Sequence, residues 1–265
     1  MLNKAKTLKN YKLNSLDGEI GKAKEFYFDD QNWSIRYLMA DTGNWLTGRR
    51  VLISPNSIVS ICKEEEYISI NLTKSKIENS PTLDSHKPVS RQFQEKLNGY
   101  FDLPMHCVGQ QMVGVCPPDV GAYPLIETKN NKEKVIESTM SDNEWDPHLR
   151  STHKVSGYDI QAMDGKIGHV DDFIIDEETW EIRYLIIDTQ NWLPGKKIVL
   201  STQWISCLSW DESKVFVNFL CKDIKQSPEY TEESILNRDY EIRLYEHYNR
   251  KGYWQVEQDV KNNSR

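Results

Sequence analysis

Arginine and aspartate recur five residues apart at two places in the chain. Arg36 is followed by Asp41, and Arg183 by Asp188, each pair inside a segment with strand-like alternation. A guanidinium can hold a carboxylate or a phosphate through two parallel hydrogen bonds, so each arginine could clamp an anion. The alternative is a structural ion pair or hydrogen bond on a strand. Both interpretations of these four candidate binding residues stay open at this point.

Two tryptophans, Trp45 and Trp192, lie beside glycines in segments expected to be loops. Large aromatic side chains dominate the binding energy of many interfaces, so each tryptophan could anchor a partner. The alternative is a plug that covers the open end of a small barrel.

The sequence contains none of the short motifs that carry familiar catalytic chemistry. It lacks G-x-S-x-G, H-E-x-x-H, G-x-G-x-x-G and a phosphate-binding loop. Acids at the expected turns do not have the spacing of a calcium loop, so they are assigned as ordinary turn residues. His106, Cys107 and Cys116 have no second Cys or His pair at zinc-ligand spacing. We therefore predict a protein that is not an enzyme, with no catalytic residues, no metal site and no cofactor.

The candidate residues come in pairs because most of the chain is a tandem duplication. Residues of the first copy return 147 positions later, without a gap. Matching positions include Tyr11 and Tyr158, Gly21 and Gly168, Asp29 and Asp176, and most of 33–38 and 180–185. A constant offset over roughly a hundred residues indicates two copies of one module.

Each copy has the pattern of a small β structure. Asp17-Gly18 and Asp164-Gly165 are strong hairpin turns. Short strands separated by turns every 8 to 12 residues or so favour a closed barrel, and Gly168 marks a place where a strand could bend. The predicted fold class is mainly β with helical extensions: two tandem small antiparallel β-barrels, each followed by a C-terminal helix.

The helical tails are predicted from proline, acids and apolar spacing. In the second copy we expect a helix to begin at Ser227-Pro228-Glu229, and in the first a shorter one around Phe93, Leu97 and Tyr100. The predicted domains are 1–107 and 151–265. Residues 108–150 have no counterpart in the other copy and are assigned as a linker.

Bulk composition limits the classes of partner. The net charge of −7 and the pI of about 5.5 argue against general nucleic-acid binding. No apolar stretch approaches the roughly 18 residues of a membrane span. With a lysine-rich start and no apolar run behind it, a cytoplasmic location is expected. Five cysteines without a C-x-x-C pair are expected to be reduced thiols.

Three motifs occur in both copies. They read Asp-Gly-x-Ile-Gly, Trp-x-Ile-Arg-Tyr-Leu and Asp-Thr-x-Asn-Trp-Leu-x-Gly, and the second copy is preceded by 146–151, Asp-Pro-His-Leu-Arg-Ser. Over about 70 residues in each copy, this pattern resembles the PRC-barrel family. That family includes the cytoplasmic domain of the photosynthetic reaction-centre H subunit and a domain of a ribosome maturation factor. The resemblance implies a six-stranded barrel that serves as an interaction or assembly module, with no enzymatic residues to carry over.

The central strand of each copy is apolar on both faces. Ile182, Tyr184 and Ile186 alternate with Arg183, Leu185 and Ile187, and the first copy has the same arrangement. A strand with one face in water should be polar on that face, so something is expected to cover the face of Leu185. We predict a pseudo-two-fold pairing of the two barrels inside one chain. A helical tail, or a second chain in a homodimer, is the alternative cover.

These observations predict a non-catalytic protein-interaction or assembly module, with its surface between the barrels or on the tails. The sequence does not specify the partner. One alternative is a small-ligand-binding or stress-responsive module with its site at the barrel mouths. Another is a peripheral component of a photosynthetic or other membrane complex.

Overall fold

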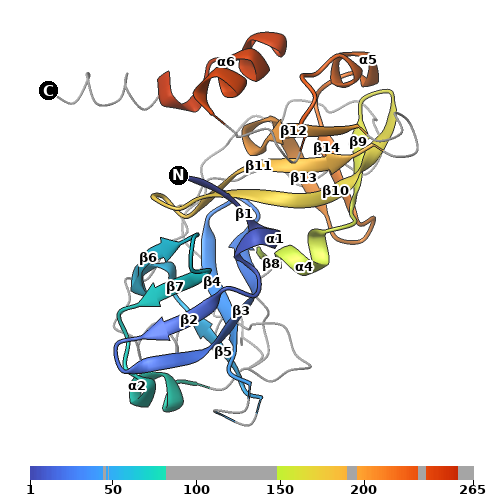
Figure 1. Cartoon of the computed structure of the whole chain (residues 1–265). Coiled ribbons are helices and arrows are strands. Elements are labelled where there is room, and N and C mark those ends of the chain that lie inside the picture. The colour runs from blue at the N-terminus through green and yellow to red at the C-terminus, as the bar shows by residue number, and fades with distance from the viewer. Residues whose placement is uncertain (44–45, 47, 82–147, 190–195, 232–236, 256–265) are drawn as a thin grey trace, which may run out of the picture.

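The computed structural model describes residues 1–43, 46, 48–81, 148–189, 196–231 and 237–255. In these ranges the chain forms two sheets of seven strands and a few short helices. Figure 1 shows the first sheet in blue and teal, and the second in yellow and orange beside it. The predicted mainly β class is confirmed.

The first sheet has the strand order β5-β4-β3-β2-β7-β6. A 3₁₀ turn, η1 (Pro55–Ser57), lies between β5 and β6, and helix α2 (Lys74–Glu78) follows β7. The six strands are β2 (Lys12–Ser15), β3 (Gly18–Asp29), β4 (Ile35–Asp41), β5 (Arg50–Ile53), β6 (Ile58–Cys62) and β7 (Tyr67–Ile70).

The second sheet has the equivalent order β12-β11-β10-β9-β14-β13. Turn η2 (Thr202–Trp204) and helix α5 (Cys221–Lys225) occupy the places of η1 and α2. The strands are β9 (Asp159–Ala162), β10 (Gly165–Asp176), β11 (Glu181–Asp188), β12 (Lys197–Ser201), β13 (Ile205–Ser209) and β14 (Lys214–Val217). Because each element begins within one residue of the 147-residue offset, the two sheets repeat one another.

The aspartates of the two hairpin turns have a structural role. Asp17 Oδ1 accepts a hydrogen bond from Lys74 N at 2.7 Å, and Asp164 Oδ1 accepts one from Cys221 N at 2.7 Å. These backbone donors lower the pKa of both aspartates. Each turn is therefore tied to the short helix that follows the last strand of its sheet.

One pairing in each sheet differs from the prediction of antiparallel barrels. β2 pairs with β7, and β9 with β14, in parallel. Six strands joined only by chain reversals would have the first and last antiparallel. At each 3₁₀ turn the chain continues in the same direction instead of reversing, so the last strand runs parallel to the first. In the described part of the chain, no ladder joins β5 to β6 or β12 to β13, so hydrogen bonds do not close either sheet there.

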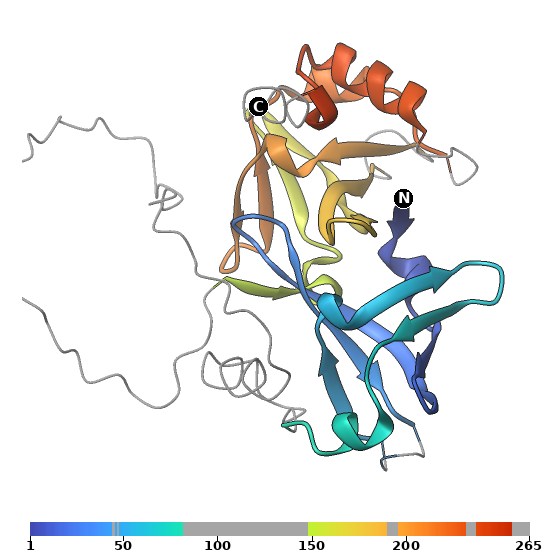
Figure 2. The same ribbon diagram turned by 90° about the vertical axis from the view of Figure 1, so that its left-hand side faces the viewer.

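The two halves exchange their leading strands. β1 (Leu2–Lys4) of the first half pairs with β10 of the second, and β8 (Leu149–Ser151) of the second half pairs with β3 of the first. Helices α1 (Ala5–Leu8) and α4 (Thr152–Val155) follow these strands. Figures 1 and 2 show the blue N-terminal strand beside the second sheet, and the yellow-green β8 beside the first. The predicted contact between the halves is thus made by reciprocal strand exchange.

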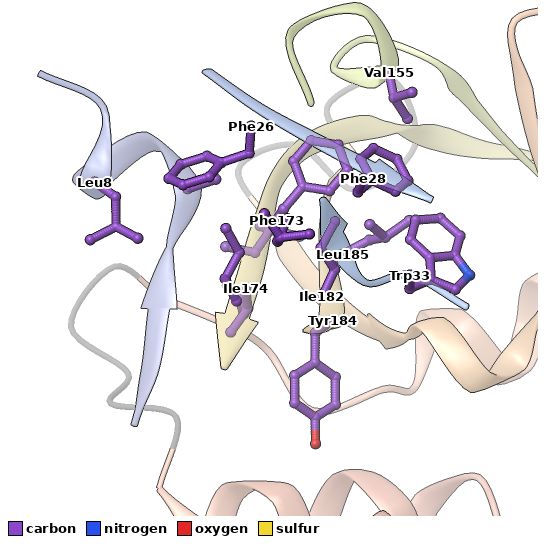
Figure 3. Close-up of a cluster of buried hydrophobic side chains, with 14 of the residues drawn as sticks. Leu8, Phe26, Phe28, Trp33, Val155, Phe173, Ile174, Ile182, Tyr184 and Leu185 are labelled. Atoms are coloured by element: carbon purple, nitrogen blue, oxygen red, sulfur yellow. The ribbon is translucent and has the colours of Figure 1, made fainter. Parts of the chain in front are cut away.

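Buried aromatic side chains from both halves meet between the sheets. Phe28 stacks on Trp33 at 5.3 Å between ring centroids and lies 5.8 Å from Phe173 of the other half. Figure 3 shows these rings with residues of both sheets around them. Leu38 and Leu185 are fully buried, so the predicted apolar faces of the central strands are covered.

The helix after the second sheet begins later than expected. α6 spans Arg238–His247, with Asn237 as its N-cap, whereas Ser227-Pro228-Glu229 is not helical. The prediction of a helix start there is wrong because Tyr230 forms a β-bridge with Lys197, which keeps this segment extended. The expected tail of the first half lies outside the described residues.

Two further expectations need correction. Leu149 and Arg150, assigned to the linker, belong to β8. Cys62 and Cys221 are free thiols, but Cys207 is disulfide-bonded, so the expectation of reduced thiols is wrong for Cys207. Spacing along the chain says little about which cysteines meet in three dimensions.

Candidate functional site

A cleft of about 670 Å³ lies where the two halves meet, and we call it the junction cleft. Its volume falls in the range of roughly 300–1,000 Å³ that is common for ligand pockets. The first half contributes the β3–β4 turn, residues 30–33. The second half contributes His148, Arg150 and the walls of its sheet. The lining from that sheet and the C-terminal region is Thr179, 181–183, 201–203, 205–208, Tyr245 and Tyr253.

The turn at the cleft wall is held in an uncommon conformation. Trp33 has φ of 59°, and its counterpart Trp180 has φ of 55°. A bulky residue rarely adopts positive φ, so the surrounding structure must stabilise it. Ile182 N donates to Trp33 O at 2.8 Å, and Ile35 N donates to Trp180 O at 2.7 Å. Each turn is thus bound to the strand of the opposite half.

Asp30 is the centre of a charged cluster at one end of the cleft. Its carboxylate lies 2.6 Å from Arg150 Nε and 3.0 Å from His148 Nδ1. The Asp30 and Arg150 side chains are 9% and 8% exposed. Burial raises the pKa of Asp30, whereas Arg150 and His148 act in the opposite direction. Arg150 also stacks on the half-exposed Trp210 ring, 4.3 Å from its centroid.

Arg183 forms a second charged cluster. Its guanidinium lies 2.7 Å from Glu181 and 3.3 Å from Asp176, and it covers the ring of Tyr253 at 4.4 Å. Tyr253 in turn donates to the buried carboxylate of Glu241 at 3.0 Å. Burial raises the pKa of Tyr253 to about 12, so this hydroxyl stays protonated at neutral pH. The cation of Arg183 is therefore compensated by two carboxylates and an aromatic face.

The structure does not bring the predicted Arg–Asp pairs together. Arg36 binds Asp29 at 3.2 Å, the equivalent of the Arg183–Asp176 pair. Asp41 accepts from Gly43 N at 3.0 Å instead. Residues five apart on a strand lie about 17 Å apart and on opposite faces, so a contact across the hairpin is closer. Asp188 is buried at the end of β11.

The two predicted anchor residues, Trp45 and Trp192, lie outside the described residues. Of the four candidates that the structure describes, only Arg183 lines the junction cleft. The sequence analysis missed Asp30, His148 and Arg150. The 147-residue offset was the signal that could have identified two of them. Asp30 matches Glu177, and Arg150, which was assigned to the linker, matches Asn3.

No group of three or more His, Cys, Asp or Glu residues in the described ranges could hold a metal ion. No described helix is long and apolar enough to cross a membrane.

Comparison with protein families gives one match, and it falls on the second half. Residues 148–220 match the model of the PRC-barrel domain. This segment is therefore similar to a PRC-barrel domain. No curated protein matches the chain. The matched segment begins with His148, which lines the cleft, and includes β8 and the six strands β9 to β14 of the second sheet.

The junction cleft is only partly built from the PRC-barrel domain. The match includes Arg150, Arg183 and the β13 wall, but residues 30–33, Tyr245 and Tyr253 lie outside it. The family match therefore accounts for the scaffold of the cleft and not for its complete lining.

Proposed function

We propose that this chain is a non-catalytic adaptor that binds another protein in the junction cleft. One observation carries the proposal: an open cleft lies between the two halves, and the charges of its arginines are compensated inside the protein. A partner seated there contacts both halves at once. Such a site is formed only when the duplicated halves are correctly paired.

The chemistry of the cleft supports a binding role rather than catalysis. His148 Nδ1 lies 3.0 Å from Asp30 Oδ1, and His148 Nε2 lies 3.1 Å from the side-chain nitrogen of Gln31. Nucleophilic catalysis needs a base that contacts a nucleophile. Here the two ring nitrogens of His148 face a carboxylate and an amide, and neither contacts a nucleophile.

We also propose that both halves are PRC-barrel-like, although the family match covers only the second. The support is the 147-residue offset, which places every strand, turn and short helix of one half on its counterpart. In a closed six-stranded barrel, the two end strands β12 and β13 would meet along a seam, and η2 connects these two strands in sequence. Thr202 Oγ1 of η2 donates to Ile182 O at 2.9 Å, a contact that helps to join that seam.

A photo-crosslinking experiment tests the adaptor proposal. A photoreactive residue replaces Gln203, which is exposed and lines the cleft, and in the control it replaces the equivalent exposed Asn56. In the source cells we expect a discrete crosslinked protein with the Gln203 probe and not with the Asn56 probe. Identical adducts from the two probes, or none from either, would contradict the proposal.

A small-ligand-binding or stress-responsive module is the second candidate. The cleft has a suitable volume, and two tyrosines and several hydroxyls line it. A thermal-shift screen against metabolites and metal ions separates the candidates, because only a ligand that binds the native state raises the midpoint. A metabolite that raises the midpoint, and loses this effect in Gln203→Trp, would favour the second candidate.

We propose that the protein is cytoplasmic, and the alternative is that it is attached to a membrane complex. Cell fractionation distinguishes the two, since a peripheral subunit sediments with membranes and is released by high salt. Analytical ultracentrifugation of the full chain measures whether it also forms a homodimer.

A further inference from the structure

We propose that the outer face of the first sheet binds an acidic, extended segment of another protein, and that one carboxylate of this segment contacts Lys24 and Arg50. We call this surface the cationic face and define it by Lys12, Lys22, Lys24 and Arg50. None of these residues lines the junction cleft, so the inference is independent of the adaptor proposal.

The second half shows how this fold holds a carboxylate at the equivalent place. Lys197 Nζ lies 3.0 Å from Asp171 Oδ2, and Lys6 of the exchanged helix α1 contacts Asp171 Oδ1. Burial raises the pKa of Asp171, but the hydrogen bonds from Lys6 and Lys197 outweigh burial, and the pKa is lowered. Two cations on separate elements therefore bind one oxygen each of a single carboxylate.

In the first half the same three positions are all basic. The 147-residue offset places Lys24 on Asp171 and Arg50 on Lys197, and His153 of the exchanged helix α4 takes the place of Lys6. The backbone is equivalent, since both Lys24 and Asp171 lie at a register shift of the long strand. The carboxylate is thus missing, while the basic residues around it are retained.

The carboxylates near this place already have other contacts. Glu25 accepts from the hydroxyls of Ser151 and Tyr27, and Asp41 accepts from Gly43 N. In the part of the chain that the structure describes, no ion pair joins Lys22, Lys24 or Arg50 to a carboxylate, whereas Lys12 lies 3.7 Å from Glu19. These three cations are therefore available to an external anion.

The four cations lie on one side of the sheet. Lys12 is opposite Lys22 in the β2–β3 ladder, and Asp41 is opposite both Lys22 and Arg50. Lys22 and Lys24 are exposed, and Ala23 between them is buried, so both lysines point outward. A depression of about 450 Å³ lies beside them, and Asn10 and Thr42 also contribute to its lining.

Comparison of the two halves shows that this charge is local. The whole chain has a net charge of −7, so an acidic ligand is not attracted by its overall charge. The cationic face has four basic residues, whereas the matching positions of the second half contain two acids, one histidine and one lysine: Asp159, Asp171, His169 and Lys197. The first half alone presents an electrostatic surface that is complementary to an acidic partner.

The geometry favours carboxylates on an extended chain. Asp171 demonstrates that one cation on each oxygen of a planar carboxylate fits this fold. Lys22 and Lys24 are two residues apart on β3, a separation of about 7 Å along a strand. Alternate side chains of an extended peptide have the same spacing, so we expect acidic residues at every second position of the partner.

Fluorescence anisotropy with the full-length chain tests the inference. The probe is a labelled peptide of alternating Glu and Ser, and its control has Gln in place of each Glu. In Lys24→Asp the first half receives the carboxylate that the second half has at this position, so the fold should tolerate the change and Arg50 gains an internal partner. Lys24→Gln removes the charge only. Lys251→Asp makes the same change of charge at an exposed lysine outside the cationic face.

We expect the wild-type chain to bind the Glu peptide and not the Gln peptide, with an affinity that falls as salt is added. The Kd should rise about tenfold or more in Lys24→Asp, less in Lys24→Gln, and less than about twofold in Lys251→Asp. Thermal melts of each variant check that the chain is folded. If Lys24→Asp is not folded, Lys24→Gln and the salt dependence decide.

Three outcomes would overturn the inference. They are no binding of the Glu peptide at low salt, equal binding of the two peptides, and equal losses of affinity in Lys24→Asp and Lys251→Asp. Vesicles that contain phosphatidylserine form a separate arm. Binding to these vesicles that requires Lys24, without binding to the Glu peptide, would replace the acidic segment with a membrane surface. None of these results affects the Gln203 crosslink, which tests the junction cleft.

Discussion

The two exchange junctions have the same backbone arrangement, but an arginine in one is replaced by an asparagine in the other. Where β8 joins β3, Arg150 binds Asp30. Where β1 joins β10, the uncharged Asn3 takes the place of the arginine, and its Nδ2 donates to Glu177 at 2.8 Å. Duplication preserved the strand exchange and left the side chains free to diverge.

The backbone N–H of the equivalent phenylalanine has a different hydrogen-bond acceptor in each junction. In the β8 junction, Phe26 N donates to the Thr152 hydroxyl at 3.2 Å. In the β1 junction, the equivalent Phe173 N donates to Asp172 at 2.8 Å, and Lys6 N donates to the same carboxylate at 3.1 Å. Both junctions have a carboxylate at this position, but Glu25 accepts from the Ser151 hydroxyl, whereas Asp172 accepts from two backbone N–H groups. The β8 junction should be sensitive to loss of an arginine, and the β1 junction to pH.

The largest effect is expected when the buried ion pair loses one partner. Arg150→Met leaves Asp30 buried with only His148 beside it, and removing one member of a buried pair costs about 3–5 kcal/mol. We expect the free energy of unfolding to fall by about 4 kcal/mol in urea titrations. The double variant Asp30→Asn/Arg150→Met should recover part of this loss. A single variant within 1 kcal/mol or so of wild type would show that the pair contributes little.

Gly21 and Gly168, which occupy equivalent positions, should both be intolerant of a larger side chain. A Cβ on Gly168 would lie 2.1 Å from Asp188 O, and one on Gly21 would lie 2.1 Å from Asp41 O. Both neighbours are backbone atoms, so each Gly→Ala change should cost about 3 kcal/mol, at the upper end of overpacking. Gly21→Ala should lose more, because Gly21 has φ of 135°. Thermal melts check this, and unequal losses in the reverse order would contradict it.

The buried carboxylate of the β1 junction should make stability depend on pH. Burial raises the pKa of Asp172 from 3.8 to about 6. The unfolded chain therefore ionises first as pH rises, and stability falls between pH 3.8 and about 6 by at most about 3 kcal/mol. Asp172→Asn removes this loss, so the variant should be the more stable protein at pH 7.5 and nearly equal to wild type at pH 3.5. Equal pH slopes for the two proteins would exclude a buried, titrating Asp172.

The smallest effect is expected at the contact between Asn3 and Glu177. Asn3→Ala removes a hydrogen bond to Glu177, which is 27% exposed and also lies 3.4 Å from the N-terminal amine. The free energy of unfolding should fall by only about 1 kcal/mol. A loss as large as that of Arg150→Met would remove the distinction between the two junctions.

The sequence was sufficient to predict what depends on local pattern. The Asp-Gly turns, the alternation of β4 and β11 and the 147-residue offset predicted the strands and their repetition. Pairings between distant segments were not predicted. Leu2–Lys4 and Leu149–Ser151 are three residues long, too short for any periodicity, and their partners lie more than a hundred residues away. The parallel pairings depend on the path of a 3₁₀ turn, which no residue pattern marked.

The candidate site was predicted less well for the same reason. Arg183 was identified, but not its partners: Asp176 lies across the hairpin, and Glu181 lies two residues before Arg183 on the same strand. Asp30, His148 and Arg150 form one cluster only after β8 has crossed to the other half. The missed residues are those that depend on the exchange.

The strand exchange also has a consequence for how the molecule can fail. Neither half can detach without losing a strand from its own sheet and withdrawing another from its neighbour. The two halves should therefore melt in a single transition, and a destabilising change in either half should destabilise both. Under selection, such an interlocked pair behaves as one heritable unit, in which a harmful change in one copy can be offset by a change in the other.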